Sequence, residues 1–263
     1  MKIMSGHSHS KKIKREKSIT DQKRGQMFSK MARVIWLAVK EGGINPETNS
    51  KLKIAIEKAK GFNLPRENIE RAIKQATGGG QEANLEEVLY EAYGPGGIAI
   101  IIEGITDNKN RTLGEVKQIL SQNNGKLVGE GAVRWLFEKR GVITVIFAYP
   151  SEAKGGDERM FIDSQLSSTK AKEELELAVI EAGAEDVRWY GDDLEVYTIP
   201  DNLEKVKKIL EEKGIKIDSF SLDWVAKETV NLDEKQKEAC QKLFEALDEN
   251  EAVQEIYSNM KLS

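Results

Sequence analysis

The spacing of apolar residues changes near residue 80, and this change constrains the fold more than any other feature of the sequence. Before it, apolar side chains recur every three or four residues in the segments 21–43, 52–61 and 65–77, which predicts three amphipathic helices. Gly-rich and Pro-containing turns separate the segments. Because these connections are short, we expect an antiparallel three-helix bundle within residues 1–80.

After residue 80 the pattern is typical of strands. Residues 88–93 and the unbroken apolar run 98–102 predict a hairpin that turns at the Gly-Pro-Gly-Gly segment 94–97. A helix is expected from about residue 113 to Gly125. The next apolar segments predict a second hairpin over 133–147, with its turn at Lys139-Arg140-Gly141.

The remaining segments alternate between helical and strand patterns. A helix is predicted over 171–182, two strands over 186–190 and 194–199, a helix from Asp201 with Glu204 completing a capping box, and a strand near 217–225. The tail predicts one more helix over 231–247 and a strand over 253–257.

A lone helix and strand at the end of a chain need a sheet to pack against. The unit at 81–132 has a hairpin but only one helix, so we infer that the C-terminal helix and strand return to it. The sequence therefore predicts an α+β fold of three domains. They are a basic tail and three-helix bundle (1–80), a discontinuous α+β domain (81–132 plus 226–263), and an inserted α+β domain (133–225). Both α+β domains are expected to carry helices on one face of an antiparallel sheet, in a ferredoxin-like, split βαβ plan.

The sequence offers little for catalysis. His7 and His9 are the only histidines and Cys240 is the only cysteine, so a His-based triad within the sheet domains is excluded. Cys240 falls on the inner face of a predicted helix, where we expect it to pack in the core. We predict no catalytic residue, no metal site, no cofactor and no small-molecule substrate. Carboxylate-based hydrolysis stays open on composition alone, although we expect the acidic pairs, such as Asp248-Glu249, to be solvated surface.

The sequence lacks a possible disulfide and a long apolar segment, and both absences bear on the cellular compartment. A single cysteine cannot form an internal disulfide, which suits a reducing compartment. The sequence has neither an apolar run of the roughly 20 residues that cross a bilayer nor an apolar core typical of a secretory signal. We therefore expect a cytoplasmic protein that does not bind membranes.

Charge is distributed unevenly along the chain. Residues 1–76 hold 18 Lys and Arg against 7 Asp and Glu, a net charge of +11, whereas the remainder holds 22 against 37, a net charge of −15. A basic front third on an acidic body points to a polyanionic partner, because cations that meet phosphates release counterions. The candidate nucleic-acid-binding residues are Lys11, Lys12, Lys14, Arg15, Lys17, Lys23, Arg24, Lys30, Arg33, Lys51, Lys53, Lys58, Lys60, Arg66, Arg71 and Lys74. Aromatic residues are sparse in this third, so base stacking is not indicated.

Several long motifs resemble one known family. They are "SGHS" at 5–8, "DQKRGQMFSK" at 21–30, "AIEKAKGFNLPRENIERAIKQATG" at 55–78, "YEAYGPGGIAIIIEGITDNKNRT" at 90–112 and "FEKRGVI" at 137–143. The chain is similar over nearly its whole length to the YebC/PmpR family, whose relatives include mitochondrial translational activators of cytochrome oxidase. The resemblance implies an N-terminal helical domain and two α+β domains, one interrupting the other.

The resemblance also implies a cytoplasmic, non-enzymatic regulatory protein that binds nucleic acid. The favoured expectation is a DNA-binding transcriptional regulator. The alternative is a ribosome-associated translation factor that binds ribosomal RNA and relieves stalling at proline-rich stretches. The motif containing Asn108, Asn110 and Arg111 matches the family, and it also suits a helix N-terminus. His9-Ser10 stands where the family usually has Lys-Trp.

Overall fold

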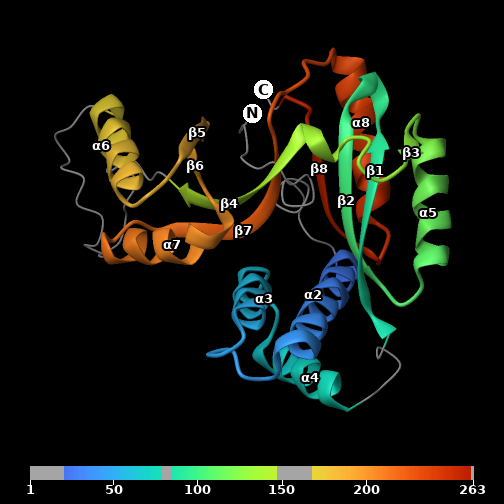
Figure 1. Ribbon diagram of the computed structural model, residues 1–263, viewed down its shortest axis with the longest axis horizontal. Helices are drawn as coiled ribbons and strands as arrows, with labels where there is room; N and C mark the ends of the chain where they lie inside the picture. The colour runs from blue at the N-terminus through green and yellow to red at the C-terminus, as the bar shows by residue number, and fades with distance from the viewer. Residues whose placement is uncertain (1–20, 79–83, 147–167, 262–263) are drawn as a thin grey trace. The chain divides into compact units, whose positions relative to one another are not determined.

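The computed structural model describes residues 21–78, 84–146 and 168–261. Within them the chain forms two compact units (Figure 1). Residues 139–225 make one unit, and the described residues before 139 and after 225 make the other. The α+β fold class is confirmed, whereas the three-domain boundaries at 80, 132 and 225 stay a prediction.

The predicted three-helix bundle is present. It consists of α2 (Asp21–Gly42), α3 (Ser50–Gly61) and α4 (Arg66–Thr77). Their apolar stripes meet in one core that includes Met31, Ile35, Leu52 and Ile69, all at most 5% exposed. Burial of these stripes supplies most of the bundle's stability, because helices this short are marginal on propensity alone.

Asn49 joins the end of α2 to the start of α3. Its side-chain oxygen accepts a hydrogen bond from the Leu52 amide at 3.0 Å, which caps α3. Its amide nitrogen donates to the carbonyls of Ala38 and Gly43, at 2.7 and 2.8 Å. One buried side chain therefore satisfies backbone groups at two helix ends, which fixes the angle between these helices.

The first sheet has the order β3-β1-β2-β8 and is antiparallel throughout. Its strands are β1 (Glu86–Tyr93), β2 (Ala99–Thr106), β3 (Lys126–Val128) and β8 (Val253–Ser258). The helices α5 (Lys109–Gln122) and α8 (Glu234–Asp248) pack on one face of it through a shared apolar core (Figure 1). The return of the tail is confirmed, because β8 pairs with β2 from Ile100 opposite Ser258 to Glu103 opposite Glu255.

The second sheet has the order β5-β6-β4-β7. It is built from β4 (Phe137–Ile146), β5 (Asp186–Tyr190), β6 (Asp193–Thr198) and β7 (Ile217–Ala226). The helices α6 (Ser168–Glu181) and α7 (Leu203–Glu212) share its core, which contains Ile143, Leu175, Val196 and Leu210. Each sheet thus carries two helices, as the split βαβ plan requires.

The second predicted hairpin, over 133–147, is wrong. Residues Arg134–Leu136 form a 3-10 turn, and β4 then runs without interruption through Lys139-Arg140-Gly141. Gly141 lies opposite Thr198 in the ladder, and a Cβ there would lie 2.4 Å from the Thr198 hydroxyl. This glycine permits close packing of strand against strand; it does not form a turn.

The capping box predicted at Asp201 and Glu204 is also wrong. A short 3-10 turn, Pro200–Asn202, precedes α7, and no side chain caps that helix. A capping box occurs instead on α8, where Asp233 and Gln236 bond each other's backbone amides. The three-residue strand β3 was not predicted, because it is too short to show a periodicity.

Glu91 on β1 organises the turn that follows β3. Its buried carboxylate accepts hydrogen bonds from the amides of Gly131 and Val133 at 2.8 Å, and from that of Arg134 at 3.0 Å. Burial acts to raise the pKa of Glu91, but these amides and the Arg134 charge outweigh it, so the net shift of this pKa is downward.

We expect Glu91→Gln to lower the free energy of unfolding by about 1–3 kcal/mol at pH 7, because the amides lose a charged acceptor. A depressed pKa means that the carboxylate's contribution is fully present above the unfolded value of about 4.3 and is lost as the pH falls through the folded value. Denaturant unfolding from pH 7 to pH 3 measures this. Glu87→Gln, an exposed site on the same strand, is the control. A difference between Glu91→Gln and wild type that stays constant with pH would contradict the assigned charge.

Candidate nucleic-acid interface

Some of the sixteen candidate cations lie beyond the described residues. They are Lys11, Lys12, Lys14, Arg15 and Lys17. Lys23 belongs to α2, but its side chain is not described. The structure describes the other ten candidates, from Arg24 to Lys74. Arg24 is exposed near the start of α2 and lines a pocket with Phe28 and Phe62.

Three cations of the bundle are bound by carboxylates near the C-terminal end of the chain. Lys30 is only 3% exposed, and its ammonium lies 3.1 Å from the Asp248 carboxylate. Arg33 contacts Glu251 at 3.0 Å.

The third of these cations, Lys58, contacts the buried Glu255 at 2.7 Å. The bundle also contacts the first sheet through an apolar cluster of Trp36, Leu37, Leu85 and Ile105. These three cations therefore fasten the bundle to the first sheet and its α8–β8 turn.

Two other cations form local ion pairs on the bundle surface. Lys51 contacts Glu41 at 2.5 Å, and this hydrogen bond is the main cause of the raised pKa of Lys51. Arg66 contacts Glu70 at 2.7 Å although its own side chain is 90% exposed. Exposed pairs of this kind contribute about 0–1 kcal/mol, so a phosphate can replace the carboxylate at little cost.

Four further candidate cations are exposed on the bundle: Lys53 and Lys60 on α3, and Arg71 and Lys74 on α4. Within the described part of the chain, no carboxylate lies within ion-pair distance of them. Lys53 and Lys60 are two helical turns apart and so share one face of α3. These four side chains are the bundle cations best placed to meet a polyanion.

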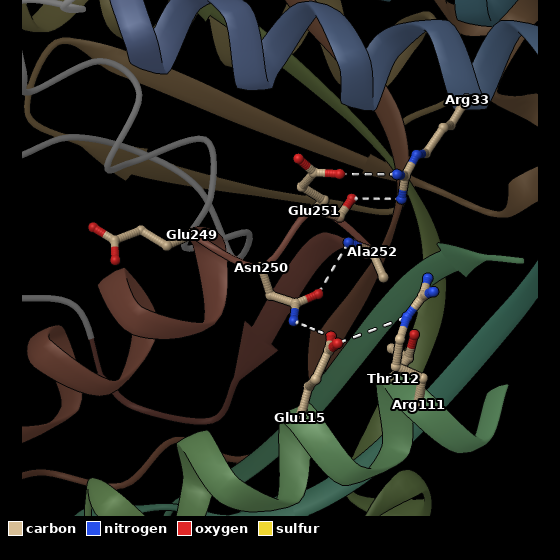
Figure 2. Close-up of a pocket in the computed structure, with 8 residues that line it drawn as sticks. All are labelled: Arg33, Arg111, Thr112, Glu115, Glu249, Asn250, Glu251 and Ala252. Carbon is tan, nitrogen blue, oxygen red and sulfur yellow. Dashed lines mark hydrogen bonds and ion pairs between the residues drawn. The ribbon is translucent and has the colours of Figure 1, made fainter. Parts of the chain in front are cut away.

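A cavity of about 510 Å³ lies between α2, the start of α5 and the α8–β8 turn. Figure 2 shows Arg33 beside Glu251, and Asn250 and Arg111 beside Glu115, whereas the Glu249 side chain points away from them. Arg33 bonds Glu251, and Asn250 donates to Glu115 at 2.8 Å. Arg111 lies within 3.7 Å of Glu115. Because these groups satisfy each other, we interpret the cavity as part of the attachment of the bundle to the sheet.

The motif around Asn108 has a structural role. The Asn108 side chain accepts a hydrogen bond from the Arg111 amide at 3.1 Å and caps α5. Arg111 also pairs with Asp107 on the preceding turn at 2.5 Å. These contacts account for the asparagine and the arginine without a ligand.

The side chains considered for catalysis or metal binding lie either in a core or outside the described residues. Cys240 is fully buried in the first core, and burial raises the pKa of its thiol to about 11. His7 and His9 lie outside the described residues. In the described ranges, no group of three or more His, Cys, Asp or Glu side chains is arranged to hold a metal ion. No helix of those ranges is both long and apolar enough to cross a bilayer.

Sequence reasoning missed the acidic partners of the bundle. Asp248 was expected on a solvated surface, but it pairs with Lys30. Glu251 and Glu255 were not singled out, although they bind Arg33 and Lys58. Each pair joins residues about two hundred positions apart in the sequence, and no local pattern signals such a contact.

The pair of Lys30 and Asp248 gives a direct test of this attachment. We expect Lys30→Gln to lower the free energy of unfolding by about 1–3 kcal/mol, because it leaves a partly buried carboxylate without its charged partner. The matched control Lys53→Gln, on an exposed face of the same bundle, should change it by less than about 0.5 kcal/mol. The double variant Lys30→Gln, Asp248→Asn should recover part of the loss. Equal effects of the two single variants in denaturant unfolding would contradict the structural role of Lys30.

Two family models match consecutive parts of the chain. Residues 8–79 match the model described as TACO1/YebC protein N-terminal domain. Residues 85–260 match the model described as TACO1/YebC second and third domain.

Proteins similar to this chain match it over almost its full length. A probable transcriptional regulatory protein of Caldanaerobacter subterraneus is 43% identical over 259 residues, covering 98% of this chain and 99% of that protein. One of Syntrophus aciditrophicus is 44% identical over 261 residues, covering 98% and 96%. The crystal structure of a conserved hypothetical protein of Aquifex aeolicus superimposes with a TM-score of 0.77 at 38% identity, covering 92% of both chains.

Proposed function

The chain belongs to the TACO1/YebC family, and from this premise we propose that it is a non-enzymatic regulatory protein that binds nucleic acid through the exposed cations of its helical bundle. The observation that carries the proposal is the position of Lys53, Lys60, Arg71 and Lys74. They are exposed, whereas five other cations of the bundle pair with carboxylates, so the charge of these four is available to phosphates.

Duplex DNA is the first partner that we propose, with the regulation of transcription as the process. Support comes from the relatives, which are named probable transcriptional regulatory proteins. Three of the four exposed cations are lysines, which act as point charges and do not read base edges. We therefore expect contacts to the phosphate backbone to dominate the affinity.

The lysine-dominated surface also favours a second candidate, a translation factor that binds structured ribosomal RNA. Backbone contacts of this kind suit a folded RNA as well as a duplex. Either role places the protein in the cytoplasm, where nucleic acid and ribosomes are accessible. Neither requires a cofactor or a small-molecule substrate.

A non-enzymatic role is supported by the state of Cys240. The raised pKa keeps its buried thiol protonated at neutral pH, so it is not available as a nucleophile. The relatives' names describe regulation and no reaction.

Neutralising the four cations tests the proposal. We expect Lys53→Gln, Lys60→Gln, Arg71→Gln and Lys74→Gln together to weaken binding to every nucleic acid. The slope of log K against log salt should become shallower by about 0.9 for each lost phosphate contact with duplex DNA. The control variant removes the same charge from the first sheet and its helices, by changing four exposed lysines to Gln: Lys117, Lys126, Lys235 and Lys242. Equal losses in the two variants would show that net charge, and not the bundle surface, governs binding.

Binding of the wild-type protein to promoter duplexes and to ribosomes, measured across a salt series, separates the two roles. Discrimination among promoters at physiological salt without co-sedimentation with ribosomes supports transcription. The reverse result supports translation. Absence of salt-dependent binding to either partner contradicts the proposed function.

A further inference from the structure

One helix of the second sheet carries apolar side chains on its solvent side. Leu177 and Ile180 of α6 are 61% and 54% exposed, whereas Leu175 and Val179 of the same helix are buried in the core. Residues three apart in a helix are neighbours on its surface, so Leu177 and Ile180 form one exposed apolar patch, the α6 patch. The helix is therefore apolar on two faces, although covering a sheet requires only one.

The other helix of this sheet, α7, has a different outer face. Its exposed side chains are all charged: Lys205, Lys208, Glu211 and Glu212. Covering the second sheet therefore does not require exposed aliphatic side chains. The two on α6 leave apolar surface in contact with water, and burying that surface against a partner is favourable.

Unpaired acids lie next to the α6 patch. Glu173 and Glu174 are exposed, and neither forms an ion pair within the described ranges. They precede Leu177 by four and three residues, so these three side chains are neighbours on the helix surface. At the other end of the patch, Glu181 is already paired with Lys213 at 2.7 Å. The two free carboxylates are therefore the groups of this face that can pair with cations of a partner.

The charge of this face indicates the kind of partner. Among the described side chains of α6, Lys170 is the one exposed cation, against the exposed Glu173, Glu174 and Glu181. This excess of acid repels an anionic lipid surface and a phosphate backbone. A second copy of the chain would bring like charges together. A protein segment with basic residues beside an apolar stripe meets neither obstacle.

We propose that the outer face of α6 binds a basic amphipathic helix of a partner protein. The apolar stripe of that helix, with side chains three and four residues apart, packs on Leu177 and Ile180. Lysines or arginines beside the stripe pair with Glu173 and Glu174. The contact is small, so the complex is weak and reversible. The inference goes beyond the proposed function, because α6 lies in the unit of residues 139–225 and the bundle cations lie in the other unit.

A synthetic helix tests this inference. The probe is a fluorescent peptide of about 18 residues, or about five helical turns, with leucines three and four residues apart and lysines and glutamines elsewhere. Its control has the same composition, but the leucines are distributed around the helix, so the charge is kept and the apolar stripe is lost. In fluorescence anisotropy we expect the full-length protein to bind the probe about tenfold more tightly than the control peptide.

The first variant removes the α6 patch. Leu177→Gln with Ile180→Gln changes exposed positions to a residue with good helix propensity, so α6 should stay folded. We expect this variant to bind the probe about tenfold more weakly, at the level of the control peptide. The matched control is Leu113→Gln with Ile44→Gln, which changes side chains that are 40% and 56% exposed in the other unit. It should leave probe binding unchanged, and thermal melting checks that each variant is folded.

The second variant removes the acids. We expect Glu173→Gln with Glu174→Gln to weaken binding of the probe about threefold and to reduce its salt dependence. Glu228→Gln with Glu238→Gln removes the same charge from exposed positions of the other unit and should have no effect. Equal losses in these two variants would overturn the assigned contact, because net charge alone would then explain binding.

Other results decide between the occupants. Equal binding of probe and control peptide, or unchanged binding by the Leu177 and Ile180 variant, overturns the inference. Without peptide binding, a dimer in sedimentation that this variant abolishes overturns it in favour of a second copy. Binding to vesicles of phosphatidylcholine and phosphatidylglycerol that the variant abolishes, again without peptide binding, overturns it in favour of a lipid surface.

The same variants separate this inference from the proposed function. The bundle variant of Lys53, Lys60, Arg71 and Lys74 should bind the probe as wild type does, and the variant of Leu177 and Ile180 should keep its affinity for nucleic acid. Loss of probe binding with nucleic-acid binding intact supports the α6 contact. Loss of both in the variant of Leu177 and Ile180 overturns the separate role of α6 and leaves the proposed function to its own test.

Discussion

The antiparallel pairing of β8 with β2 is the contact on which the rest of this structure depends. It adds β8 to the first sheet as an edge strand beside β2 and lays α8 on the same apolar core as α5. The pairing also places Asp248, Glu251 and Glu255 where cations of the bundle reach them. Sheet completion and bundle attachment therefore have one origin, because both require the tail to return.

The cations of the bundle fall into two classes with different physics. Lys30, Arg33 and Lys58 are at least partly buried and face carboxylates, so removing the carboxylate leaves a cation with poor solvation. Lys53, Lys60, Arg71 and Lys74 are exposed to solvent, and phosphates can neutralise such cations while releasing counterions. Burial, not residue type, separates a cation that attaches the bundle to the sheet from one that faces solvent.

Much of the fold followed from local patterns. The three bundle helices and most strands were predicted because period and turn residues act over a few neighbours. The hairpin expected over 133–147 failed because Gly141 resembles a turn residue, whereas it is required for the close approach of Thr198. The capping box expected at Glu204 failed because Pro200–Asn202 forms a separate 3-10 turn. In both cases a tertiary contact or an alternative local turn outweighed a short motif.

The sequence by itself determined the α+β class, the helical bundle and the concentration of positive charge in the first 76 residues. Composition and periodicity are properties of the chain that need no contacts. Only the tertiary structure decided which cations are paired with carboxylates. Lys30 and Lys53 look alike in sequence, but of these two only Lys30 meets a carboxylate near the C-terminal end, that of Asp248. It also brought Phe28 and Phe62 into one cavity, although the sequence had shown only sparse aromatic residues. The physical reason is that charge pairing and cavity walls are short-range and depend on which distant segments pack together.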